Sequence, residues 1–203
     1  MTTTATSGAG AERVHVVDGS PVDLPRAERA VAELLAALGI ELSDGVRDTP
    51  RRAAAAYAEL LTARPFSLTT FPNEADYDEL VLARDIPFHS LCEHHLLPFV
   101  GVAHIGYLPG ERILGLSKLA RVVERFARGL QVQERLTKQV ADWLQDQLGA
   151  KGIGVVVEAE HLCMSLRGVQ ASGTRTVTSA VHGLLRDDGR SRQEFFALTG
   201  IHR

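Results

Sequence analysis

Apolar residues recur at helical spacing in the first part of the chain. The segment RAERAVAELLAALG, which follows Pro25 and stops at Gly39, predicts an amphipathic helix. A second helix is predicted where Asp48 or Thr49 could cap the first turn, with Pro50 inside that turn and an alanine run behind it. The two segments predict a helical hairpin, and neither carries a residue pattern typical of catalysis.

After residue 78 the pattern changes to that of β-strands. The segments 79–95 and 96–112 are rich in apolar and β-branched residues, and LPGER at 108–112 is a turn signal, so two neighbouring strands are predicted. A third strand is predicted over GIGVVVEAEHLCMSL, residues 152–166, and a fourth over the Thr- and Val-rich segment 173–183. The chain therefore holds two pairs of predicted strands.

Two amphipathic helices separate these strand pairs. GLSKLARVVERFARGL has Ser117 as its predicted N-cap, and QVQERLTKQVADWLQDQLG ends at Gly149. A short helix over RSRQEFFALTG is predicted near the end of the chain. Paired strands followed by paired helices indicate an α+β fold with an antiparallel sheet.

Composition divides the 203 residues into three regions. A balance of 45% hydrophobic and 23% charged residues is typical of a globular protein with a substantial core. Residues 1–24 are rich in Thr, Ser, Gly and Ala and predict a disordered tail. An N-terminal helical region then spans 25–75, and the domain that holds the predicted strands spans 76–203.

Charge and hydropathy indicate which classes of partner the protein is expected to bind. The formal net charge is −3, so no overall basic field indicates nucleic acid. No apolar run reaches the roughly 18 residues that span a bilayer, and the N-terminus lacks the basic start and apolar segment of a secretory signal. We therefore expect a cytoplasmic protein without a nucleic-acid or membrane partner, in which the two cysteines stay reduced.

The segment HSLCEHHLLPF places one of the two cysteines beside three histidines. Cys92 and His95 form a C-x-x-H pair. The other cysteine, Cys163, follows His161 by two residues, and on an extended strand two such residues share a face. Two thiolates and an imidazole with one open position make the ligand set of a catalytic zinc site.

Other interpretations of this cluster stay open at the level of residues alone. Each cysteine could be a small buried hydrophobe, and a lone histidine is more often structural than catalytic. A closed structural zinc site would need a fourth ligand, which His89, His94 or His161 could supply.

A basic set begins the third predicted helix. Ser117, Lys118 and Arg121 lie in its first turns, where free N–H groups and the helix dipole favour anions. With Arg167, which follows the third strand, these cations could hold a polyphosphate. The alternative is an ordinary solvated helix start. No G-x-x-x-x-G-K-[ST] loop is present, so any nucleotide would be held in another way.

The segment QVQER adds amide and carboxylate side chains. Gln131 and Gln133 flank a valine, and Glu134 follows. A carboxylate can accept two hydrogen bonds from the edge of a guanine base, and an amide can both donate and accept. Taken alone, the same segment is also typical of an exposed helix start.

Five runs together resemble one family. CEHHLLPFVG, GLSKLARVV, QVQERLT, EAEHLCMSLRGV and TRTVTSA occur in the order found in GTP cyclohydrolase I, the zinc-dependent first enzyme of folate and pterin biosynthesis, within roughly residues 48–200. One departure is Leu130, where the family often has proline. The change affects the stiffness of that loop and not its chemistry.

The resemblance implies a role for each matching residue. The implied zinc ligands are Cys92, His95 and Cys163. The implied acid–base residues are His94 and His161, and Ser117 is an implied proton carrier. The implied contacts to the triphosphate are Lys118, Arg121 and Arg167. The implied contacts to guanine are Gln133 and Glu134. His89 receives no role.

The resemblance also implies the fold, the reaction and the assembly. The fold is the tunnelling fold, a four-stranded antiparallel sheet with two antiparallel helices on one side. The reaction opens the imidazole ring of GTP with Zn²⁺, releases formate and closes a new ring to give 7,8-dihydroneopterin triphosphate. Five subunits form a barrel, two rings stack as a homodecamer, and active sites form between subunits.

Two other functions are compatible with parts of this pattern. A tunnelling-fold relative acting on GTP, another purine or a pterin would yield a different product. A non-catalytic zinc-binding protein would need a fourth protein ligand and would not turn over GTP. Both catalytic histidines and QVQER argue against these alternatives.

Overall fold

The structure, a computed structural model, describes residues 22–200. The tail predicted over residues 1–24 therefore lies almost entirely outside the described residues. Within 22–200, no helix is both long enough and apolar enough to cross a membrane.

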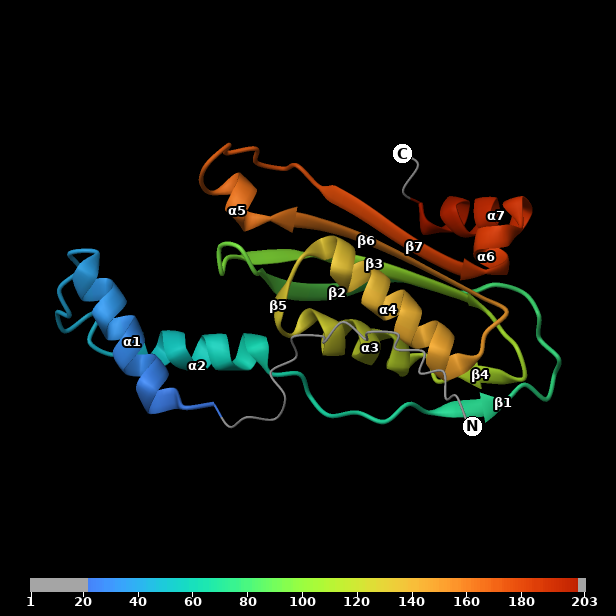
Figure 1. Ribbon diagram of the computed structural model, residues 1–203, viewed down its shortest axis with the longest axis horizontal. Helices are drawn as coiled ribbons and strands as arrows, with labels where there is room; N and C mark the ends of the chain where they lie inside the picture. Colours follow the sequence, from blue (N-terminus) through green and yellow to red (C-terminus); the bar gives the residue numbers. More distant parts are fainter. Residues whose placement is uncertain (1–21, 201–203) are drawn as a thin grey trace, which may run out of the picture.

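A five-stranded sheet forms the centre of the molecule, in the strand order β5-β2-β3-β6-β7 (Figure 1). The pairs β2–β3, β3–β6 and β6–β7 are antiparallel, which confirms the predicted α+β class. The fifth strand, β5, was not predicted and pairs in parallel with the end of β2. The strand bounds are β2 Val81–Cys92, β3 Pro98–Leu108, β5 Leu130–Gln131, β6 Gly152–His161 and β7 Thr176–Gly183.

Helices α3 (Ser117–Ala127) and α4 (Gln133–Leu148) cover one face of this sheet (Figure 1). Their apolar residues recur three and four apart and are buried against alternate residues of the strands, because side chains of a strand point to opposite faces. The main core includes Leu119, Val122, Leu136 and Val140 from the helices and Ile105, Tyr107 and Val157 from the strands.

The opposite face carries a smaller cluster under two C-terminal helices, α6 (Leu184–Asp187) and α7 (Gly189–Thr199). Phe195 of α7 is fully buried there. Its ring lies against Gly106 and Gly154, and a Cβ at Gly154 would be 2.6 Å from the ring. The two glycines therefore make the space that lets α7 pack on the sheet, and the predicted short helix near the C-terminus is confirmed.

The predicted helical hairpin is formed by α1 (Leu24–Ala37) and α2 (Thr49–Leu61), which extend away from the sheet (Figure 1). No residue of α1 is buried. Tyr57 of α2 connects the hairpin to the sheet domain, since its hydroxyl donates to the Leu96 carbonyl at 3.3 Å. β1 (Thr70–Pro72) is the next element along the chain and pairs with β4 (Arg112–Leu114) in a two-stranded ribbon at the end of the molecule opposite the hairpin (Figure 1).

The predicted cap residue of α3 was wrong, and that of α2 was right in position but makes no capping bond. The N-cap position of α3 is Leu116 and not Ser117, and no side chain caps this helix end. Asp48 does occupy the N-cap position of α2, but its side chain accepts no capping hydrogen bond and instead lies near Arg51 and Arg52. Ion pairing with these arginines competes with the backbone for the Asp48 carboxylate.

The third predicted strand is shorter than expected, so Cys163 is not on a strand. β6 ends at His161, and Leu162–Ser165 form a short helix, α5. His161 pairs with Phe99, and the next residue of β3 is Pro98, which has no N–H to continue the ladder. Gln131 also differs from the prediction, since it belongs to β5 and α4 begins only at Gln133.

Candidate metal centre and substrate site

Cys92, His95 and Cys163 meet at one end of the sheet. Cys92 ends β2, His95 lies in the following turn, and Cys163 lies on α5. One ligand atom from each residue lies within 4.8 Å of the other two, and this is the one such group of three or more His, Cys, Asp or Glu residues in the described part of the chain. Cys92 Sγ and His95 Nδ1 are 3.8 Å apart. Two such ligands on a tetrahedral zinc lie about 3.5 to 3.8 Å apart, so the group fits this metal.

The turn after β2 brings His95 back toward Cys92. The N–H of Cys92 donates to the Leu97 carbonyl at 2.9 Å, and the N–H groups of His95 and Leu96 both donate to the Cys92 carbonyl. Leu96 adopts a left-handed backbone with φ of 55°. These bonds close the CEHH turn and hold the C-x-x-H pair in place for a shared ligand.

The chemistry of the two thiols also fits a cation. Both cysteines are free. Burial raises the pKa of the Cys163 thiol, and the neighbouring Cys92 raises it further. A thiol with a raised pKa holds its proton until a cation compensates the negative charge, and a metal dication can then bind the thiolate.

His161 lies two residues before Cys163, at the end of β6. Its ring stacks on the buried Phe99 ring, with centroids 4.7 Å apart and an interplanar angle of 3°. Burial lowers the pKa of His161, and the charge of Glu134 partly opposes that effect. The structure thus brings His161, Glu134 and the three-residue metal group into one region.

The predicted contact of Gln133 with guanine needs an accessible side chain, whereas Gln133 is buried. Its side chain is only 1% exposed. Its amide nitrogen donates to the carbonyls of Val157 at 3.0 Å and Thr176 at 2.9 Å, and its oxygen lies 2.8 Å from His161 Nε2. Glu134, the next residue, is exposed and open to a ligand.

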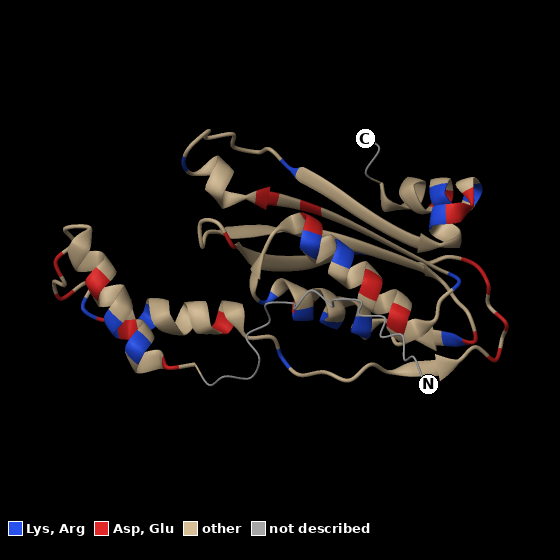
Figure 2. Cartoon of the chain, viewed as in Figure 1, with Lys and Arg blue, Asp and Glu red and all other residues tan. Residues whose placement is uncertain are grey.

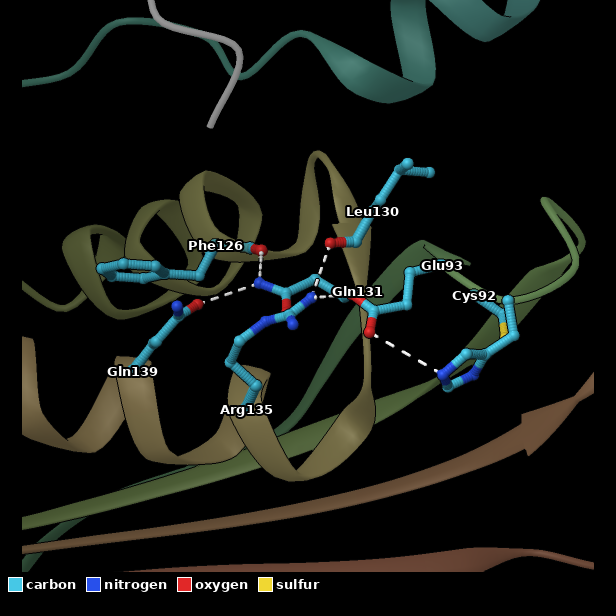
Figure 3. Close-up of polar contacts among 8 residues, drawn as sticks. Cys92, Glu93, Phe126, Leu130, Gln131, Arg135 and Gln139 are labelled. Carbon is cyan, nitrogen blue, oxygen red and sulfur yellow. Dashed lines mark hydrogen bonds and ion pairs between the residues drawn. The ribbon is translucent and has the colours of Figure 1, made fainter. Parts of the chain in front are cut away.

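A polar network that sequence reasoning missed connects the CEHH turn to α4 (Figure 3). Arg135 donates to Glu93 at 2.5 Å, to the Leu130 carbonyl and to Gln131 Oε1. Gln131 in turn donates to Gln139 and to the Phe126 carbonyl. The last residue of QVQER therefore holds the turn that carries Cys92 and His95.

His94 lies at the end of this network that is nearest to Cys92. Its Nε2 is 3.7 Å from Glu93 Oε1, and its Nδ1 is 3.8 Å from Cys92 Sγ. His94 is exposed, so its ring can meet a ligand from outside the chain.

The predicted phosphate contacts are divided between two places. Arg167 follows α5 and lies close enough to Cys163 for its charge to oppose, in small part, the raised pKa of that thiol. Ser117 and Lys118 begin α3 beside β4, whereas the other end of α3 leads to β5 and the metal group (Figure 1). The two ends of α3 are ten residues apart, which corresponds to a rise of about 15 Å along the helix axis. Figure 2 shows several Lys and Arg positions, coloured blue, along α3.

Arg121 lies one turn into α3, between the start of that helix and the end that leads to the metal group. It pairs with Glu124 at 3.2 Å and lines a cavity of about 270 Å³ together with Arg64, His89 and Arg128. His89, which has no predicted role, has a pKa lowered first by burial and then by Arg128.

Comparison with known proteins decides the family. The family model described as GTP cyclohydrolase I matches residues 27–200. The chain belongs to the GTP cyclohydrolase I family. The resemblance based on the five sequence runs is therefore confirmed.

Individual relatives are similar in sequence to this chain over most of their length. GTP cyclohydrolase 1 of Thermobifida fusca is 52% identical over 179 residues, which cover 85% of this chain and 86% of the relative. GTP cyclohydrolase 1 of Mycobacterium marinum is 53% identical over 178 residues, covering 85% and 88%. The protein of the same name from Aquifex aeolicus is 48% identical over 178 residues, covering 87% and 97%. The chain is an enzyme with GTP cyclohydrolase I activity.

Replacing Arg135 by methionine is expected to loosen the CEHH turn. The pair with Glu93 is about one-third exposed on each side, so its own contribution is about 1 kcal/mol, but the change also leaves Gln131 Oε1 and the Leu130 carbonyl without their donor. We expect a loss of about 2 kcal/mol, seen as a melting temperature lower by about 4 to 8 °C, together with reduced GTP turnover.

Lys138→Met on the same helix is the matched control, because its pair with Asp142 is more exposed and spans a single helix turn. This control is expected to shift the melting temperature by no more than about 2 °C. Equal shifts in the two variants would show that the Arg135 network adds nothing to an ordinary surface pair.

Proposed function

We propose that this enzyme uses zinc, held by Cys92, His95 and Cys163, to open the imidazole ring of GTP and to form 7,8-dihydroneopterin triphosphate with release of formate. The observation that carries the proposal is the three-ligand group two residues from His161. Two thiolates and an imidazole suit zinc better than a hard cation such as Mg²⁺. Three protein ligands also match a catalytic site rather than a closed structural one.

A zinc ion at this position would lower the pKa of a bound water to about 7 and so supply a hydroxide nucleophile near neutral pH. The surrounding side chains would then manage protons and hold the substrate. Ring opening between carbon 8 and nitrogen 7 of the base requires a proton at nitrogen 7. We assign this proton to His161, because partial burial keeps its pKa below the ordinary value, so that the protonated ring gives up its proton readily.

The later steps need further proton transfers. The ribose ring has to open, rearrange and close onto the amine of the pyrimidine. We assign opening of the ribose to His94, which is exposed beside Glu93, and proton transfer during the rearrangement to Ser117. A neutral hydroxyl suits the second role, since it can donate and accept at one atom.

Substrate binding is assigned to charged side chains. The exposed Glu134 carboxylate is suited to the donor edge of guanine, and Lys118, Arg121 and Arg167 are suited to the triphosphate. Gln133 was expected to share the contact with guanine. Since its amide is already bonded within the chain, we leave recognition of the base to Glu134.

The separation of these groups supports the proposal of a homo-oligomer. Ser117 and Lys118 begin α3 at the end remote from the metal group, so one chain does not gather all the predicted contacts around one GTP. A second copy could supply them. We propose the tunnelling fold and a decamer of two pentameric rings with shared active sites, and a cytoplasmic location that keeps both ligand thiols reduced.

The test is a product assay. The purified protein with zinc is incubated with GTP, and formate and fluorescent oxidised neopterin are both measured. We expect the two products in equal amounts. Formate without neopterin would contradict the ring closure. It would favour a relative of the family that forms another product. Neither product from zinc-loaded protein would contradict the enzyme and favour a zinc-binding structural role.

A further inference from the structure

The side chain of Gln133 connects α4 to two strands and to His161. Gln133 is the first residue of α4 and is 1% exposed. Its Nε2 lies 3.0 Å from the Val157 carbonyl of β6, 2.9 Å from the Thr176 carbonyl of β7 and 3.2 Å from Thr178 Oγ1. Its Oε1 lies 2.8 Å from His161 Nε2. Every polar atom of this amide therefore has a partner inside the chain.

These partners fix which way the amide faces. Backbone carbonyls only accept hydrogen bonds, so the group that faces Val157 and Thr176 has to be the NH₂ of the amide. The oxygen of Gln133 then faces His161, and an amide oxygen also only accepts. The hydrogen between Gln133 Oε1 and His161 Nε2 must therefore belong to His161.

The same argument fixes the tautomer of His161. A neutral imidazole carries one hydrogen, and with that hydrogen on Nε2 the other nitrogen, Nδ1, keeps its lone pair. Phe99, which is fully buried, stacks against the ring at 4.7 Å between centroids and sets its plane. Gln133 sets the rotation of the ring within that plane. Two contacts thus define both the position of the ring and its chemically free nitrogen.

We infer that Gln133 is a positioning residue, which holds the His161 imidazole in its Nε2–H form and leaves Nδ1 as the nitrogen that takes up the proton released by the attacking water and passes it to the substrate. The inference rests on the proposed role of His161 in proton transfer. It differs from the sequence-based prediction, in which Gln133 contacts guanine. A base that used the Gln133 amide would have to displace the Val157 and Thr176 carbonyls or His161 itself.

Steady-state kinetics of the zinc-loaded assembly separates the two roles. Gln133→Met keeps the length of the side chain but removes the acceptor for His161. We expect kcat to fall about 100-fold while KM for GTP changes less than about 3-fold, because a misplaced acid affects the reaction and not the binding of the base. A raised KM with an unchanged kcat would show that Gln133 reads guanine and would overturn the inference.

Thr178→Val is the matched control for the buried network. Thr178 contacts the same amide nitrogen and the Thr137 hydroxyl, but not His161. We expect its kcat and KM to stay within about 3-fold of those of the unchanged enzyme. A loss of kcat equal to that of Gln133→Met would mean that general disruption of the network explains the effect, and would contradict positioning.

A second measurement needs no variant at position 133. In the zinc-loaded enzyme labelled with ¹⁵N-histidine, the His161 signals are identified by their absence in His161→Asn. At a pH where the ring is neutral, we expect a pyrrole-type shift for Nε2 and a pyridine-type shift for Nδ1. The reverse pattern would overturn the inference. If the unchanged enzyme released no formate, the proposed function would fail, yet this measurement would still decide the tautomer.

Discussion

Cys163→Ser is expected to lose both the bound metal and GTP turnover while the assembly persists. The change removes one of only three protein ligands in the metal group, and a serine hydroxyl does not ionise near neutral pH as a thiol on zinc does. We expect zinc to fall from about one ion per chain to a small fraction, and turnover to fall at least about 1000-fold. Elemental analysis and formate release measure the two effects.

The assembly should survive because Cys163 lies on the four-residue helix α5 and only its partly buried side chain packs against the main core. Light scattering on the purified variant tests this point. Ser165→Ala on the same helix is the control, since its hydroxyl makes only a 3.4 Å contact to the His161 carbonyl. Stoichiometric zinc in Cys163→Ser would refute the ligand assignment, as would an equal loss of zinc in Ser165→Ala.

His161→Ala is expected to separate metal binding from the chemistry. None of the three metal ligands changes, so zinc should remain at about one ion per chain. Turnover should fall by about 100- to 10,000-fold, the range that a positioned acid or base contributes. Because this proton is needed when the imidazole ring opens, formate release should fall together with neopterin formation.

His104→Asn is the control for the loss of a buried imidazole. His104 is 3% exposed and, like His161, has a pKa lowered by burial, but its Nδ1 only accepts from the Asp85 N–H. Asparagine can accept the same bond. This variant is expected to keep full turnover per folded chain. Normal turnover in His161→Ala would show that another residue supplies the proton.

The order of helices and strands could be predicted because it depends on local periodicity. Apolar residues at helical spacing marked α3 and α4, and runs of β-branched residues marked β2, β3, β6 and β7. The candidate metal ligands could also be predicted from the sequence, because C-x-x-H closes within a single turn and both cysteines lie beside histidines.

The failures have long-range causes. α5 begins where Pro98 ends the β3 ladder, which is a pairing between residues some 60 positions apart. Burial of Gln133 is decided by carbonyls 24 and 43 residues away. Nothing in QVQER itself distinguishes an exposed guanine contact from a buried support of His161.

The Arg135 network illustrates the same limit. Its partner Glu93 is 42 residues away and belongs to the motif that first suggested the metal. Both residues lie in matched runs of the family, so a motif can be identified correctly while the contact between two motifs stays invisible.

We propose that zinc held by Cys92, His95 and Cys163 drives the opening of GTP. The most direct test removes zinc with a chelator and returns it stepwise while formate release is measured. We expect no turnover without metal and a rise in proportion to zinc, ending at about one ion per chain. Full turnover in the metal-free protein, or none at full zinc occupancy, would contradict the claim.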